Sequence, residues 1–176
     1  MNTEKVIGFI CGVGVALLLV WAVLKRSNTD GSTHTEYDER QKVIRGIGFK
    51  YGFYTLITYL FLLMLAEIAE LKLPVSTSVI YFTGIVISGL VLSGYTIMHD
   101  AYWGLNNNIQ FYTRFLMSIG VLNLIFGFAE MFRHQMIVGG ILQDNFINFE
   151  AGILLAGIGV MLLIRSRQNR REEDGE

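Results

Sequence analysis

The chain has 176 residues, of which 52% are hydrophobic and one is a proline, and its net charge is −1. Its single cysteine, Cys11, excludes a disulfide framework or a cysteine-based zinc site within one chain. The apolar residues form blocks of about 20, the length of helix that spans a hydrocarbon core of roughly 30 Å. This pattern excludes an ordinary water-soluble domain and predicts an all-α polytopic membrane protein, with residues 1–176 as a single membrane domain.

The first predicted span covers residues 6–24 and is followed by the basic pair Lys25 and Arg26. A cleaved signal peptide is the alternative, but the apolar run is longer than an ordinary h-region and no small-x-small cleavage site follows it. Small residues recur in this span at four-residue spacing: Gly8, Gly12 and Ala16. Such a stripe lets another helix approach closely, or its glycines are simply tolerated in a lipid-facing helix.

Residues 25–50 are predicted to be a cytoplasmic linker followed by an amphipathic interfacial helix. The linker over 27–33 is polar and without periodicity, so we expect it to be mobile. In the run 36–50, EYDERQKVIRGIGFK, acids precede bases, which complements the helix dipole, and apolar residues recur at helical spacing. Such a helix lies on the membrane surface, and Gly46 with Gly48 predicts a bend from it into the next span.

A short motif carries a resemblance. Asp38-Glu39-Arg40-Gln41 precedes an aromatic, threonine-containing span, and Arg45 and Gly46 follow it. The motif resembles a signature of small, uncharacterised multi-pass membrane proteins of bacteria and archaea, in which an Asp-Glu-Arg motif also precedes a transmembrane helix. The resemblance implies the membrane class but no activity. The candidate residues for docking a partner are Asp38, Glu39, Arg40, Gln41 and Arg45.

Four more spans are predicted, over residues 51–73, 74–98, 111–132 and 149–164, with a polar tail over 165–176. Pro74 is suited to the first turn of the third span. Residues 136–142 are apolar but too short to cross, so they are expected to be interfacial or partly re-entrant.

Five spans place the termini on opposite sides. With the N-terminus outside, 11 of the 14 Lys and Arg residues fall on the cytoplasmic side. The positive-inside rule therefore predicts a cell (inner) membrane protein with a cytoplasmic C-terminus.

That topology gathers four carboxylates towards the outer face: Glu67, Glu70, Glu130 and Glu150. Glu67, Glu70 and Glu130 are the candidates for an ion or proton site, because a carboxylate at membrane depth needs a partner or a proton. The structural alternative is a set of helix-end carboxylates wetted by headgroup water and paired with basic residues. At the inner face, Asp100 is expected to meet Arg114 across the turn between two spans.

The sequence contains no HExxH, GxxxxGK[ST] or GxSxG motif, and it predicts no catalytic residue, metal or cofactor. Basic residues beside the spans are explained by orientation and anionic lipid, so nucleic-acid binding is not predicted. The favoured function is a non-enzymatic accessory, regulatory or assembly protein that binds the lipid bilayer and other membrane or cytosolic partners, or itself as a homo-oligomer. The alternative is a small proton- or cation-linked transporter or channel subunit that uses the outer carboxylates.

Overall fold

The computed structural model describes residues 3–174, which form five helices and one two-stranded hairpin. The helices are α1 (Thr3–Ser27), α2 (Glu39–Ile68), α3 (Thr77–Met98), α4 (Ile109–Phe132) and α5 (Phe146–Asp174). The strands are β1 (Ile137–Val138) and β2 (Ile141–Leu142). All five helices are long and apolar enough to cross a membrane, as the sequence predicts.

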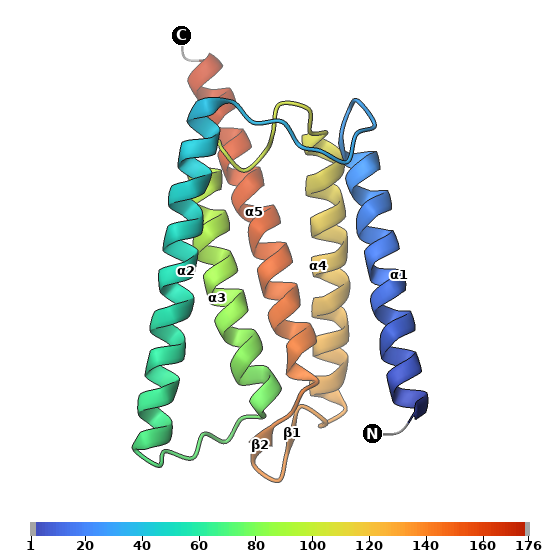
Figure 1. Cartoon of the computed structure of the whole chain (residues 1–176), viewed down its shortest axis with the longest axis vertical. Helices are drawn as coiled ribbons and strands as arrows, with labels where there is room; N and C mark the ends of the chain where they lie inside the picture. Colours follow the sequence, from blue (N-terminus) through green and yellow to red (C-terminus); the bar gives the residue numbers. More distant parts are fainter. Residues whose placement is uncertain (1–2, 175–176) are drawn as a thin grey trace.

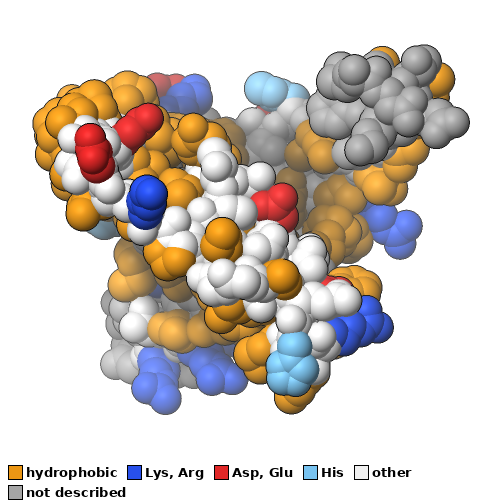
Figure 2. Space-filling view, turned by 90° about the horizontal axis from the view of Figure 1, so that it is seen from below, with side chains coloured by type: hydrophobic (Ala, Val, Ile, Leu, Met, Phe, Trp, Pro, Cys, Tyr) orange, Lys and Arg blue, Asp and Glu red, His pale blue; other side chains and the backbone are white. Residues whose placement is uncertain are grey.

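The helices alternate in direction, so the two termini lie at opposite ends of the bundle (Figure 1). We call the end at which α5 finishes the basic end, because most Lys and Arg residues lie there, and the other end the hairpin end. Neighbours pack in the order α2, α3, α5, α4, with α1 placed lightly against α4. Seen from the hairpin end, hydrophobic side chains cover much of the surface, with charged side chains scattered among them (Figure 2).

Close approach within the bundle depends on glycine. A Cβ added at Gly120 of α4 would lie 2.5 Å from the backbone nitrogen of Ala156 in α5. A Cβ at Gly48 of α2 would lie 2.8 Å from the Thr96 methyl group in α3. Both separations are far shorter than a van der Waals contact, so these glycines are where neighbouring backbones meet.

The start of α2 differs from the prediction. Within the described chain, residues 39–68 form one continuous helix, without a separate surface-lying helix or a bend at Gly46 and Gly48. The helix begins at Glu39 because Asp38 forms a capping box with Gln41, in which Asp38 accepts from the Gln41 N–H and Gln41 accepts from the Asp38 N–H. Gly48 does not bend the helix because it serves as a contact with α3.

Three other helix ends also differ from the predicted bounds. Helix α2 ends at Ile68 and α3 starts at Thr77 after the N-cap Ser76, so Pro74 lies in the loop between them and not in a helix. Helix α5 continues beyond the predicted end at Ile164, because its polar tail consists largely of helix-forming Arg, Gln and Glu residues.

The apolar segment 136–142 forms the hairpin, whose turn contains Gly139 and Gly140. Both glycines have positive φ, 59° and 77°, which a two-residue hairpin turn of this hand requires. The hairpin extends beyond the ends of α4 and α5 (Figure 1), and the Ser76 N–H donates to the Leu142 carbonyl at 2.8 Å. The segment therefore caps the bundle and does not re-enter it.

Candidate functional site

The basic end is organised by the turn that follows α3. Asp100 has a φ of 53°, in the left-handed region, and its N–H donates to the Ile97 carbonyl at 3.1 Å. The next N–H, of Ala101, donates to the Thr96 carbonyl at 2.8 Å. This pair of bonds is a Schellman motif, with Asp in the position that glycine usually takes. Asp is tolerated there better than most residues, and the turn directs its side chain towards α5.

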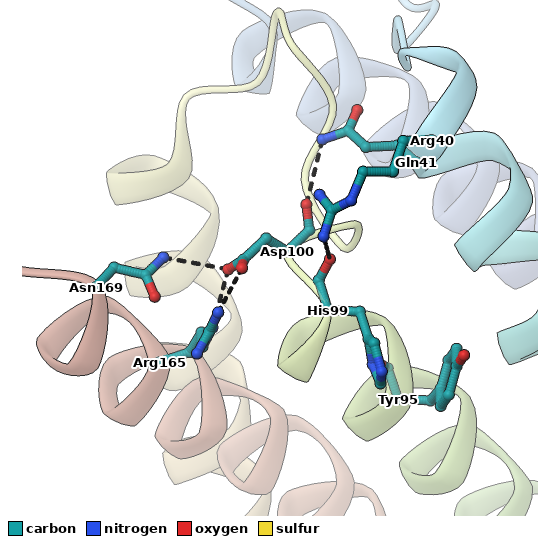
Figure 3. Close-up of polar contacts among 7 residues, drawn as sticks. All are labelled: Arg40, Gln41, Tyr95, His99, Asp100, Arg165 and Asn169. Atoms are coloured by element: carbon teal, nitrogen blue, oxygen red, sulfur yellow. Dashed lines mark hydrogen bonds and ion pairs between the residues drawn. The ribbon is translucent and has the colours of Figure 1, made fainter. Parts of the chain in front are cut away.

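The Asp100 carboxylate binds two residues of α5 (Figure 3). Arg165 donates through Nε to Oδ1 at 3.0 Å and through Nη2 to Oδ2 at 2.5 Å, and Asn169 donates to Oδ1 at 3.1 Å. The hydrogen bonds from Arg165 hold the pKa of Asp100 below its usual value, against the opposing effect of partial burial. The predicted pairing with Arg114 is therefore wrong, because α5 supplies a bidentate partner from a distant part of the sequence.

The first turn of α2 holds the backbone of the same turn. Gln41, which is 9% exposed, donates through its amide nitrogen to the carbonyls of Asp100 at 3.3 Å and Trp103 at 3.1 Å. Arg40 donates to the His99 carbonyl at 3.2 Å (Figure 3). The side chain of Gln41 thus serves the start of α2 and the end of α3 at once.

One turn further along α2, Arg45 completes this arrangement. Its Nη1 donates to the carbonyls of Ala101 at 3.4 Å and Tyr102 at 3.2 Å, and its guanidinium lies 4.0 Å from the centre of the Tyr37 ring. Burial raises the pKa of both Tyr37 and Tyr102. We call the whole arrangement the polar latch, and its members are Arg40, Gln41, Arg45, Asp100, Arg165 and Asn169.

The structure therefore brings the candidate docking residues together but uses most of them internally. Asp38 caps α2, and Arg40, Gln41 and Arg45 bind the loop after α3. Glu39 faces solvent and pairs with Lys42 at 2.6 Å, with both side chains more than half exposed. Of the five candidates, Glu39 offers the freest side chain to another molecule.

The linker over residues 27–36 is held by the loop that contains Asn106, Asn107 and Asn108. Asn107 donates to the Asn28 side chain at 2.6 Å, and Asn106 donates to the Asp30 carboxylate at 3.0 Å and to the His34 carbonyl at 2.9 Å. The Ser32 N–H and Asn106 together lower the pKa of Asp30. The expectation of a mobile linker is not confirmed, because these asparagines replace the hydrogen bonds to water that a free linker would make.

A cavity of about 390 Å³ opens beside the polar latch. Its polar lining includes Gln41, Asp100, Arg165, Asn169 and Arg170, with Trp103 among its apolar walls. Such a cavity offers hydrogen-bond donors and positive charge at the basic end, which suits a polar or acidic group.

The three candidate ion-site carboxylates do not converge. Glu67 lines an open groove between α2 and α3, and Glu70 is exposed in the left-handed position after α2, with φ 54°. Glu130 on α4 lies 3.6 Å from Arg133 and accepts from Asn145 at 3.1 Å. Helices α3 and α5 separate α2 from α4, so Glu67 and Glu130 belong to different surfaces.

The fourth outer carboxylate, Glu150, is instead buried, with 6% of its surface exposed. It lies in the second turn of α5 against Thr83 of α3. In the sequence, Glu150 is recognisable only as a carboxylate near the start of an apolar span. The rotation of α5 about its axis decides whether such a carboxylate faces outwards or lies in the interface with a neighbouring helix.

Among residues 3–174, no group of three or more His, Cys, Asp or Glu side chains is arranged to hold a metal ion. No family model, curated protein or solved structure matches the chain.

Proposed function

We propose that the chain is an accessory, regulatory or assembly protein of the cell (inner) membrane, without enzymatic activity. Its basic end faces the cytoplasm and its N-terminus lies outside, because the Lys and Arg residues concentrate at the basic end. The protein binds a helix of another membrane protein through α1 and a cytosolic partner at the basic end.

The packing of α1 carries this proposal. Its basic-end terminus is firmly attached, since Ser27 is fully buried, Asn28 is 4% exposed, and the Ser27 carbonyl accepts from the Asn108 N–H at 2.7 Å. Along its length, α1 has few contacts within the bundle, and Ser27 at its end is the one buried residue among those of 10–27 whose side chains the structure describes. A helix anchored at one end and uncovered along its span is available to a second helix.

The glycines of α1 differ from the glycines at which the other helices pack against one another. Gly48, Gly120 and several others lie against neighbouring helices, whereas a Cβ added at Gly12 or Gly14 of α1 would meet nothing within 4 Å. Close helix approach is the usual use of small residues in membrane helices. Gly12 belongs to the stripe with Gly8 and Ala16 in the sequence, so this is the face that we assign to the partner helix.

At the basic end, the polar latch fixes a surface for a cytosolic partner. Glu39 and Lys42 face outwards from it, and the tail of α5 continues with exposed Arg167 and Arg171. The latch holds α2, α3 and α5 against one another, so this surface has a defined shape, which lowers the entropic cost of binding.

Transport through Glu67, Glu70 and Glu130 has less support. A pathway needs its carboxylates to share a cavity, and Glu67 at the end of α2 lies on a different surface from Glu130 on α4. A protomer interface would have to bring them together.

Affinity purification of the tagged protein from its native membrane in a mild detergent, followed by mass spectrometry, tests the proposal. The informative pair is Gly12→Leu and Gly14→Leu, because the two positions lie on opposite faces of α1 and both have room for the new side chain. We expect a membrane-protein partner that is lost in Gly12→Leu and kept in Gly14→Leu. Recovery of the chain alone from the wild type would contradict the proposal.

Glu39→Ala and Lys42→Ala test the cytosolic surface without disturbing the latch, because both side chains are exposed. Alanine at Arg40 or Gln41 would remove contacts that hold the fold, so loss of a partner in those variants would not identify a binding residue.

A further inference from the structure

The interface between α3 and α5 encloses a carboxyl group that the proposed function does not use. Glu150 is 6% exposed, and its Oε1 is in hydrogen-bond contact with the Thr83 hydroxyl group. Its Oε2 is buried and has no hydrogen-bond partner among the described residues. Within the same residues, Glu150 takes part in no salt bridge.

The number of protons available to Thr83 and Glu150 indicates whether the Glu150 carboxyl group is protonated. The Thr83 hydroxyl oxygen lies 2.8 Å from the Val79 carbonyl as well as in contact with Glu150. A threonine hydroxyl has one proton and therefore donates once. An ionised Glu150 would leave two acceptors competing for that proton, whereas a protonated Glu150 donates to Thr83 while Thr83 donates to Val79.

The groups on the other helices supply neither a counter-charge nor another proton. From α2, the Tyr59 hydroxyl donates to the Ile80 carbonyl at 2.6 Å, so its proton is already used. Helix α3 has no charged residue in its sequence, and the α4 carboxylate Glu130 is engaged with Arg133 and Asn145. On α5, the nearest basic residue along the sequence is Arg165, which binds Asp100 at the opposite end.

The burial of Glu150 also favours the protonated carboxyl group. An ionised carboxylate inside a helix bundle at membrane depth is costly unless it has a counter-ion or several donors. Glu150 has one hydroxyl neighbour and an unpaired oxygen. A neutral carboxyl group avoids most of that cost.

We propose that Glu150 and Thr83 form a proton-binding site between α3 and α5. The Glu150 carboxyl group holds its proton at neutral pH and donates it in a hydrogen bond to the Thr83 hydroxyl oxygen. Deprotonation breaks the carboxyl O–H bond, transfers the proton to a water molecule, and leaves a carboxylate that needs water or a cation at Oε2. Loss of the proton therefore loosens the α3–α5 contact at the hairpin end.

Infrared difference spectroscopy of the full chain in liposomes, titrated from neutral to alkaline pH, tests this proposal. We expect the wild type to show the C=O stretching band of a protonated carboxyl group at neutral pH, and Glu150→Gln to lose it. Glu130→Gln is the matched control, since Glu130 is paired with Arg133 and should not contribute to that band.

Thr83→Val provides a second test that does not depend on removing the carboxyl group. Valine has nearly the same shape as threonine but accepts no hydrogen bond. The C=O band of protonated Glu150 should therefore persist in Thr83→Val and move to higher frequency. A wild-type spectrum with carboxylate bands alone at neutral pH, unchanged in Glu150→Gln, would overturn the proposal. So would a Glu150 carboxylate band that responds to Na⁺ or K⁺, because the site would then hold a cation.

Discussion

Asp100 and Arg165, 65 residues apart in the sequence, form a bidentate ion pair that fixes the end of α3 against α5. Arg165 is the first charged residue after the apolar run of α5, and Asp100 lies in the first turn of chain after α3. The pair therefore sits where two membrane helices leave the apolar region, and it sets how far α5 projects beyond α3.

Asp100→Asn should destabilise the basic end by about 1 kcal/mol, because a charged bidentate contact becomes a neutral one in a partly exposed site. Arg165→Lys should cost a similar amount, since lysine cannot form the two parallel bonds. Hydrogen exchange should become faster in the last turns of α5 in both variants. Unchanged exchange there would show that the pair does not hold α5.

Stability should also fall in acid. The pKa of Asp100 is lower in the folded protein than its ordinary value of 3.8, so the carboxylate contributes stability above that value and loses it as the pH falls through the lower, folded pKa. The thermal unfolding midpoint in detergent should therefore drop as the pH is lowered below 3.8. Asp100→Asn should reduce that drop. An identical acid response in both proteins would mean that other carboxyl groups cause it.

Substitutions can separate the two roles of the Gln41 side chain, which caps α2 and binds the α3–α4 loop. Gln41→Ala removes the capping contact and both bonds to the α3–α4 loop, and the loss of these three hydrogen bonds should cost about 2 kcal/mol. Gln41→Glu keeps the capping box but loses the amide donor. Thermal midpoints should rank the wild type highest and Gln41→Ala lowest. Equal values for Glu and Ala would show that the cap contributes nothing measurable.

Two glycine-to-alanine changes should have opposite effects. Gly120→Ala forces its new methyl group against the Ala156 backbone and should cost about 1–3 kcal/mol by separating α4 from α5. Gly46→Ala meets nothing within 4 Å on α2 and should stabilise that helix by about 0.5–1 kcal/mol. Unfolding in detergent measures both. A neutral Gly120→Ala would indicate that the two helices can separate without cost.

Glu70 offers a simple route to a more stable protein. Its φ of 54° is unfavourable for a residue with a Cβ, and it is the left-handed residue of a Schellman motif in which Leu71 donates to the Ala66 carbonyl at 2.9 Å. Glu70→Gly should raise stability by about 1 kcal/mol. Glu70→Ala is the control for loss of charge and should give no gain. A gain from both variants would assign the effect to the charge.

The sequence predicts the helices better than the contacts between them. Blocks of apolar residues locate all five spans, and α4 matches its predicted range within two residues at its start. A separate surface helix is not shown, because residues 39–50 carry a strong N-cap beside their interfacial pattern and continue into α2, where Gly48 packs against α3.

The side chain with which a polar residue pairs depends on how the helices are rotated and on contacts between residues distant in sequence. Asp100 has Arg114 nearby in sequence, yet Arg165 reaches it because α5 packs against α3. Glu150 resembled the other outer carboxylates, but α5 starts at Phe146 and rotates Glu150 towards Thr83. Neither relationship leaves a periodic signal in the sequence.

Site-specific photo-crosslinking from α1 in native membranes tests the central claim most directly. A photoreactive residue at Gly12 should crosslink to a membrane protein other than this chain, and the same residue at Gly14, on the opposite face, should not. Crosslinking of both positions to lipid alone, or of Gly12 to a second copy of this chain, would contradict the account of α1 as the contact for a partner helix.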